Sequence, residues 1–270
     1  MRNIFRMAIY GKGGIGKSTI ASNLAVSFSL LKKSTLLMGC DPKRDTTRNL
    51  LSGKLIPTVL DSIQKNNSIT LEKVVHRGYN GVFCVESGGP EPGIGCAGRG
   101  IILAIETLEK LGLFDQVDTV IFDVLGDVVC GGFAMPIRKG YANYVYIVIS
   151  GEFMSLYAAN NICKGIKRFS DRKGALLGGL IYNSRDVPNG LEISKKFAKK
   201  IGTDILGEIP RSNLILKGDI QRKTVFEAFP DSDIVERFKE LTHNIMKSSP
   251  TTPKPLSYEE LEDLAIQTLL

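Results

Sequence analysis

The chain has 270 residues, of which 43% are hydrophobic and 23% are charged, an ordinary composition for a soluble globular protein. It is long enough to bury a large core, and it contains no apolar run of about 18 residues or more, so we expect no membrane-spanning helix. The formal net charge of +7 comes from scattered lysines and arginines, so we expect neither a nucleic-acid partner nor a membrane partner.

The first predicted element is a short buried strand at residues 7–10, and a glycine-rich segment follows it directly. This segment reads GKGGIGKST from Gly11 to Thr19 and fits the pattern G-x-x-x-x-G-K-[ST]. Beyond it, apolar residues recur at helical spacing, namely Ile20, Leu24, Phe28 and Leu31. Strand, glycine loop and helix start form the context in which backbone N–H groups bind phosphate, so the segment predicts a nucleotide site.

The residue types in this loop predict how the phosphates are held. Lys17 is expected to reach the β- and γ-phosphates, and Ser18 to ligate Mg²⁺. Lys12 adds a second cation directly after the first glycine, a feature that resembles the deviant P-loop ATPases. In that group the early lysine contacts the partner's nucleotide, so the resemblance implies a homodimer. The predicted phosphate-binding residues are Gly11, Lys12, Gly13, Gly14, Ile15, Gly16, Lys17, Ser18 and Thr19.

A second parallel strand is predicted at residues 35–40, and Asp41 follows it. Phosphates bind at the carboxyl ends of parallel strands, so we expect Asp41 near the nucleotide, although an aspartate here could also cap a turn. Short helices are predicted at residues 59–64 and 71–76, and a third strand at residues 81–86.

A loop rich in glycine and proline, residues 87–95, precedes a helix that Cys96 opens. The next predicted strand, residues 119–122, ends at Asp123, and Asp123 to Gly126 reads D-x-x-G. This is the acidic switch of a P-loop ATPase: Asp123 can hold a Mg²⁺-bound water, and the Gly126 N–H can approach the γ-phosphate.

The remaining strands are predicted at residues 144–149, 176–183 and 204–210, with helices between them. Alternating strands and helices predict an α/β fold, a single-domain P-loop NTPase with a mostly parallel sheet and helices on both faces. We expect the P-loop ATPase domain to occupy residues 1–248. Residues 249–270 then form a tail, an extended spacer followed by a short acidic helix from residue 258.

The five cysteines divide into two groups. Cys40, Cys84 and Cys163 lie in apolar or helical patterns typical of buried thiols. Cys96 and Cys130 each stand at a loop-to-helix junction beside glycine, where a thiolate is stabilised. An iron–sulfur cluster takes four thiolates, so a two-fold dimer could hold one cluster on its axis. A zinc site, a redox-active pair and two unreactive thiols remain alternatives.

The chain resembles the iron protein family of nitrogenase and its relatives. The matching stretches, in family order between Ala8 and Arg185, are AIYGKGGIGKST, GCDPK, VESGGPEPGIGCAGRG, DVLGDVVCGGFAMPIR, YAANNICKGI and GGLIYNSR. The resemblance implies an ATP-driven one-electron donor, a homodimer bridged by one 4Fe–4S cluster. Cys96 and Cys130 match the cluster ligands, and Arg99 matches an arginine that some members ADP-ribosylate.

The same resemblance assigns the nucleotide contacts. Lys12, Lys17 and Ser18 match the phosphate and Mg²⁺ residues, and either Asp41 or Asp127 would position the attacking water. The family has two switch segments, which change shape with the state of the nucleotide. Asp41 and Asp45 match the first switch segment, and Asp123 and Asp127 match the second. Asn183, Pro210 and Arg211 match the residues that contact the adenine. Six residues separate Asp123 from Cys130, so loss of the γ-phosphate could move the loop that holds the cluster.

The implied partners are a nitrogenase or nitrogenase-like catalytic protein and a low-potential electron donor such as ferredoxin or flavodoxin. The chain departs from nitrogenase iron proteins in its short segment between Asp45 and Cys84 and in Leu216, where a polar residue is usual near the adenine base. The run from Lys54 to Leu60 resembles relatives that make a nickel tetrapyrrole or cleave carbon–sulfur bonds. A partitioning ATPase is disfavoured by the acidic C-terminal helix, and an iron–sulfur scaffold ATPase by the absence of a late C-x-x-C. The phosphate loop begins too near the N-terminus for a signal peptide, so we expect a cytoplasmic protein.

Overall fold

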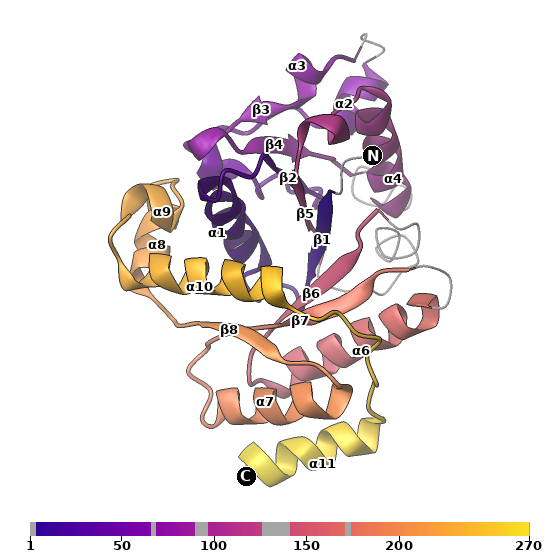
Figure 1. Cartoon of the computed structure of the whole chain (residues 1–270), viewed down its shortest axis with the longest axis vertical. Helices are drawn as coiled ribbons and strands as arrows, with labels where there is room; N and C mark the ends of the chain where they lie inside the picture. The colour runs from indigo at the N-terminus through magenta and orange to yellow at the C-terminus, as the bar shows by residue number, and fades with distance from the viewer. Residues whose placement is uncertain (1–3, 66–68, 90–96, 126–140, 171–173, 270) are drawn as a thin grey trace.

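A computed structural model describes residues 4–65, 69–89, 97–125, 141–170 and 174–269. Within these residues one eight-stranded sheet runs through the molecule in the order β3-β4-β2-β5-β1-β6-β7-β8 (Figure 1). Neighbouring strands are parallel, except that β3 runs antiparallel to β4. The strands are β1 (Phe5–Tyr10), β2 (Thr35–Gly39), β3 (His76–Arg77), β4 (Phe83–Glu86), β5 (Thr119–Asp123), β6 (Tyr144–Ile149), β7 (Leu176–Asn183) and β8 (Ile205–Ile209).

Helices cover both faces of this sheet, as Figure 1 shows. None of the helices in the described residues is long and apolar enough to cross a membrane. They are α1 (Lys17–Leu30), α2 (Val59–Gln64), α3 (Leu71–Val74), α4 (Ala97–Lys110), α6 (Phe153–Ser170), α7 (Gly190–Ile201), α8 (Asn213–Ile220), α9 (Val225–Ala228), α10 (Asp233–Lys247) and α11 (Tyr258–Leu269).

Two apolar layers result from the alternation of side chains along each strand. On β1, Met7 and Ile9 join the layer beneath α1, α9 and α10, whereas Ala8 and Tyr10 join the layer beneath α4, α6, α7 and α11. All four side chains are fully buried. Strands buried on both faces read as continuous apolar runs, which explains why the sequence shows them so clearly. The predicted α/β fold with helices on both faces is confirmed.

Two boundaries differ from the prediction in one segment. The helix predicted to reach residue 76 ends at Val74, because His76 and Arg77 pair with Cys84 and Phe83 as the short strand β3. The strand predicted from residue 81 begins at Phe83, after a 3-10 turn that includes Gly81. Pairing with β4, the next strand along the chain, here overrides the local helical preference of the sequence.

The C-terminal tail packs against the helices α6 and α7 on one face of the sheet. Thr251 pairs with Leu177 in an isolated antiparallel bridge. Asn160 of α6 donates to Leu256 O at 2.9 Å and accepts from Leu256 N at 2.8 Å, which satisfies a buried stretch of backbone. Leu261 and Leu264 of α11 are buried in the layer that contains α6 and α7. The predicted division at residue 248 stays a prediction.

Candidate nucleotide site

The phosphate loop connects β1 to α1 through backbone conformations that require glycine. Gly11 has φ +143°, and a Cβ there would overlap the carbonyl oxygen of Val148. Gly16, the residue before α1, has φ +101°, and a Cβ there would lie 2.6 Å from Asn183 Nδ2. The loop therefore closes against β6 and β7 only because both positions lack a side chain.

Lys17 holds its ammonium group within the curve of this loop. Its Nζ donates to Gly11 O at 3.1 Å and to Lys12 O at 3.2 Å, and the residue is 9% exposed. The positive end of α1 begins at the same residue. A concentrated positive potential thus faces the space above the loop, as a polyphosphate site requires.

A cavity of about 290 Å³ lies over the loop and the carboxyl ends of β2 and β5. Its lining combines three segments that are far apart in the sequence, the phosphate loop, the residues after β2 and the end of β5. The lining residues are Gly13, Gly14, Gly16, Lys17, Ser18, Thr19, Asp41, Lys43, Asp45, Asp123, Val124 and Leu125. Predicted phosphate, Mg²⁺ and switch residues therefore meet at one place, although their roles stay predictions.

Asp123 is the buried acid of this cavity, with 2% of its surface exposed. Burial raises the pKa of Asp123, whereas the Ser18 and Thr46 hydroxyl groups and the Lys17 charge lower it. Thr46 Oγ1 donates to Asp123 Oδ2 at 2.7 Å, while Oδ1 has no hydrogen-bond partner within the described residues. A buried carboxylate oxygen without a donor, beside a serine hydroxyl, fits a hydrated Mg²⁺ ion.

The predicted adenine-side residues lie outside the lining of this cavity. Asn183, at the end of β7, donates from Nδ2 to Ile15 O at 2.7 Å and so contacts the phosphate loop itself. Pro210 and Arg211 follow β8, and Arg211 pairs at the surface with Asp186 at 3.4 Å. The structure thus brings Asn183 to the loop, and the assignment of all three to adenine stays a prediction.

Lys12 also lies outside the cavity lining. Its Nζ is 3.8 Å from Glu152 Oε2, and both side chains are about 40% exposed. An exposed cation at the mouth of the loop is available to a second molecule, in contrast to the buried Lys17.

The predicted cluster ligands Cys96 and Cys130 lie outside the described residues, as do Gly126 and Asp127. Arg99 is an exposed residue in the first turn of α4. In the described part of the chain, no group of three or more histidine, cysteine or acidic residues could hold a metal ion.

The other three cysteines are free and buried, as predicted: Cys40, Cys84 and Cys163. Burial raises the pKa of the Cys84 and Cys163 thiols to about 12, so both stay protonated at neutral pH.

Three residues of this region were not predicted from the sequence, namely Thr46, Thr47 and Glu86. Thr46 binds Asp123, and Thr47 binds the buried carboxyl of Glu86. Glu86 ends a strand in the same way as Asp123, and this position is the signal that would have revealed it.

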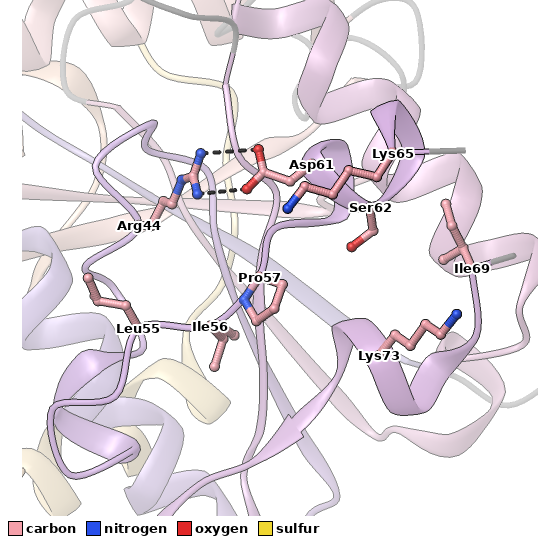
Figure 2. A pocket seen from close by; sticks show the side chains of 9 residues that line it. All are labelled: Arg44, Leu55, Ile56, Pro57, Asp61, Ser62, Lys65, Ile69 and Lys73. Carbon is pink, nitrogen blue, oxygen red and sulfur yellow. Dashed lines mark hydrogen bonds and ion pairs between the residues drawn. The ribbon is translucent and has the colours of Figure 1, made fainter. Parts of the chain in front are cut away.

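A second hollow, of about 530 Å³, lies beside α2 (Figure 2). Arg44 forms an ion pair with Asp61 of α2, in which Nη1 lies 2.6 Å from Oδ2 and Nη2 donates to Oδ1 at 3.1 Å, drawn as the dashed lines in Figure 2. Leu55, Ile56 and Pro57 line the hollow below this ion pair. None of the predicted site residues lies there, and the ion pair connects the segment after β2 to α2.

The fold and the loop define the class of protein, a P-loop nucleotide-binding protein. MinD from Pyrococcus horikoshii, solved with Mg-ADP, matches with a TM-score of 0.69 and 18% identity over 90% of this chain and 97% of that one. A ParA family ATPase from Chlorobium tepidum matches with a TM-score of 0.68 and 18% identity over 89% and 98%. At these identities the likeness shows the fold alone.

Sequence comparison shows the family. Residues 5–270 match the model of the NifH/frxC family, described as 4Fe-4S iron sulfur cluster binding proteins, and the chain belongs to this family. "Nitrogenase iron protein 2" of Methanothermobacter thermautotrophicus is 51% identical over 96% of each chain. "Nitrogenase iron protein" of Methanospirillum hungatei is 52% identical over 96% of this chain and 94% of the relative.

Family membership confirms the predicted resemblance, the enzyme class and the cofactors. The chain is an ATP-hydrolysing iron–sulfur reductase of the nitrogenase type, and its cofactors are a 4Fe–4S cluster and Mg-ATP. A further relative, "Nitrogenase iron protein" of Methanococcus voltae, is 50% identical over 96% of this chain and 95% of the relative.

Proposed function

We propose that two copies of this chain share one 4Fe–4S cluster and couple Mg-ATP hydrolysis to the delivery of single electrons to a nitrogenase catalytic protein. Cys96 and Cys130 of each copy are the proposed ligands. The observation that carries the proposal is the cavity in which the phosphate loop meets Asp41, Asp45 and Asp123, in a chain of this family.

The chain's own residues would perform the phosphoryl transfer by position and charge. Lys17 would leave the carbonyl groups of Gly11 and Lys12 and bind the β- and γ-phosphates. Ser18 would ligate Mg²⁺, and Asp123 would accept a hydrogen bond from a metal-bound water through its unpartnered Oδ1. Either Asp41, which lines the cavity, or Asp127 would orient the attacking water.

The second copy would complete the nucleotide site. Lys12 lies outside its own cavity lining and is partly exposed, which suits a cation that reaches across an interface. Mg²⁺ and the partner lysine together would stabilise the charge that develops on the transferred phosphoryl group. The cluster, when bound, supplies one-electron redox chemistry.

The proposed partners follow from the family. Relatives of about 50% identity are named nitrogenase iron proteins, which favours a nitrogenase catalytic protein as electron acceptor. A low-potential ferredoxin or flavodoxin is the proposed donor, and the cytoplasm is the proposed location. Asn183, Pro210 and Arg211 are proposed to contact the adenine, and Arg99 to be a site of ADP-ribosylation.

Iron content tests the proposal. Protein purified without oxygen should be a brown dimer with about four iron atoms per two chains. Cys96→Ala and Cys130→Ala should each abolish the cluster signal and retain Mg-ATP binding, because the two sites use different residues. Cys163→Ala, which removes a buried thiol on α6, is the matched control and should keep the iron. Colourless, iron-free protein after anaerobic reconstitution would refute the shared cluster.

A further inference from the structure

Glu86 is a fully buried acid that the phosphoryl-transfer chemistry does not use. It ends β4, and its Oε1 accepts hydrogen bonds from Thr47 N at 2.8 Å and from Thr47 Oγ1 at 2.7 Å. Its Oε2 has no hydrogen-bond partner within the described residues. Burying a carboxyl group costs roughly several kcal/mol. A fold that keeps such a group can use it to fix the position of the residues that bind it.

Glu86 and Asp123 stand on either side of one strand end. In the sheet register, Gly39 of β2 is the partner of Glu86 on β4 and also of Asp123 on β5. A Cβ on Gly39 would overlap Glu86 Oε2 and would lie 2.8 Å from Thr46 Cβ. The glycine therefore lets the two acids and the threonines meet above β2.

Consecutive threonines connect the segment at residues 41–47, here called the 41–47 loop, to these two acids. Thr46 donates to Asp123 and Thr47 donates to Glu86, and both threonines are buried. Asp41 lies at the start of this loop, in the lining of the nucleotide cavity. The loop is thus held at its far end by two hydrogen-bonded carboxyl groups.

A nucleotide in the cavity would affect the Thr46–Asp123 hydrogen bond and the Thr47–Glu86 hydrogen bonds differently. Asp123 lines the cavity, so a metal-bound water would compete with Thr46 for its carboxylate. Glu86 does not line the cavity, so a ligand of the cavity would not compete for its bonds to Thr47. Thr47 is then the fixed point about which the 41–47 loop can turn.

The same loop touches the chain that leaves β4. Ser87 donates its N–H to Gly39 O at 2.8 Å, and a Cβ on Gly89 would overlap the ring of Pro42. Gly89 therefore contacts the 41–47 loop at its beginning, Ser87 binds the end of β2 just before it, and Glu86 contacts the loop at its end. Cys96 follows seven residues after Gly89 in the sequence.

We propose that Glu86 is a positioning residue of the nucleotide cycle. Its carboxyl group holds the 41–47 loop at Thr47, so that a shift of Asp41 and Asp45 on Mg-ATP binding is passed to residues 87–89, on the way to Cys96. This inference rests on the proposed function, because it takes Mg-ATP as the ligand of the cavity.

Hydrogen–deuterium exchange on the anaerobic, cluster-containing dimer, with and without Mg-ATP, tests this coupling. In the unaltered protein, Mg-ATP should slow exchange at residues 41–47 and at residues 87–89. Thr47→Val removes the hydroxyl donor and keeps the shape of the side chain. It should bind Mg-ATP within about threefold of the unaltered protein and lose at least about half of the response at residues 87–89.

The conservative variant Thr47→Ser keeps the hydroxyl group and should restore the full response. Glu86→Gln removes the charge and should act in the same direction as Thr47→Val. Thr242→Val is the matched control, since Thr242 is an equally buried threonine whose hydroxyl donates to Phe238 O at 2.9 Å, away from the cavity.

The outcomes separate this inference from the proposed function. No response to Mg-ATP at residues 41–47 in the unaltered protein would contradict the proposed function. A response at residues 41–47 without one at residues 87–89, or an undiminished response in Thr47→Val, would overturn the role of Glu86 alone. Failure of both Thr47→Val and Glu86→Gln to yield folded protein would show a purely structural role and overturn it as well.

Discussion

Lys17 and Lys12 lie in one loop but in different surroundings. The Lys17 ammonium group is bonded to two main-chain carbonyl groups and is 9% exposed, whereas the Lys12 side chain is 40% exposed beside Glu152. A buried ammonium group can bind only a ligand in its own cavity, whereas an exposed ammonium group can also bind a group on another molecule. Two lysines five positions apart therefore support two different proposed roles.

Lys17→Gln should weaken Mg-ATP binding about 30-fold or more, or ~2 kcal/mol, because charge-assisted hydrogen bonds to phosphate are lost. Equilibrium dialysis with the anaerobic dimer measures this affinity. Lys33→Gln, which alters an exposed lysine after α1, is the control and should bind normally. Equal affinities for the Lys17→Gln and unaltered proteins would contradict the phosphate contact.

Glu86 predicts a measurable pH dependence of stability. Burial raises the pKa of Glu86 from 4.5 to about 7, against the hydrogen bonds from Thr47, and the charges of Asp123 and Asp45 raise it further. Between about pH 4.5 and pH 7 the folded state therefore binds more protons here than the unfolded state. The contribution is fully present below pH 4.5 and is lost as the pH rises to 7, on the order of 3 kcal/mol.

Glu86→Gln should remove this dependence, since glutamine does not titrate. The midpoint of denaturant unfolding should fall between pH 5 and pH 7.5 in the unaltered protein by more than it falls in the variant. The difference between the two proteins isolates Glu86 from all other titrating groups. Parallel pH profiles would show that Glu86 keeps an ordinary pKa in the fold.

The local part of the site was predictable and the distant part was not. The spacing from Gly11 to Ser18 identifies the phosphate loop by itself, because the residues predicted to bind phosphate lie in one short run of the chain. Thr46 reaches Asp123 across 77 positions, and Thr47 reaches Glu86 across 39. Such pairs depend on which strands become neighbours, and no local pattern records that.

At the scale of elements, local and distant forces can be separated in the same way. The helix predicted at residues 59–64 agrees with α2, where the Thr58 side chain accepts from Asp61 N and fixes the start. The strand predicted at residues 176–183 agrees with β7, which lies inside the sheet and is almost wholly buried. Strand β3 was not predicted, because two residues are too few to show a period and only β4 holds them.

The Asn160 side chain holds the part of the extended stretch between α10 and α11 that contains Leu256. Asn160→Ala should destabilise the protein by roughly 2–4 kcal/mol, because it leaves a buried N–H and a buried C=O of Leu256 without partners. Asn244→Ala, which removes a single bond to Leu206 O in a partly buried setting, is the control and should cost about 1 kcal/mol. Denaturant unfolding gives both values.

Limited proteolysis distinguishes a loosened tail from a loosened sheet. Cleavage of Asn160→Ala within residues 248–257, at a protease concentration that spares the unaltered protein, is the expected result. Resistance equal to that of the unaltered protein would mean that α11 and the Thr251 bridge hold the tail without Asn160.

At the scale of the whole molecule, the predicted nucleotide site and the C-terminal helix α11 lie on different elements of the fold. The cavity lies at the carboxyl ends of β2 and β5, whereas α11 packs on α6 and α7 (Figure 1). Lys12 lies outside the cavity lining and its side chain is 40% exposed, which agrees with a proposed dimer in which Lys12 crosses the interface.

Small-angle scattering tests that dimer. Mg-ATP should reduce the radius of gyration of the anaerobic dimer, and Lys12→Ala should abolish at least about half of the reduction, because the crossing cation is lost. Lys110→Ala, at the exposed end of α4, should compact normally. Unchanged compaction in Lys12→Ala would contradict the crossing role.

The hydrogen bonds from Lys17 to Gly11 O and Lys12 O have a consequence for selectivity. An arriving anion must outcompete two main-chain carbonyl groups, so the measured affinity is a difference between two sets of bonds rather than the strength of one. A weakly charged metabolite gains too little from that exchange, and a polyphosphate with its Mg²⁺ gains enough. The two carbonyl contacts of Lys17 therefore favour the binding of a polyphosphate over that of small anions of low charge.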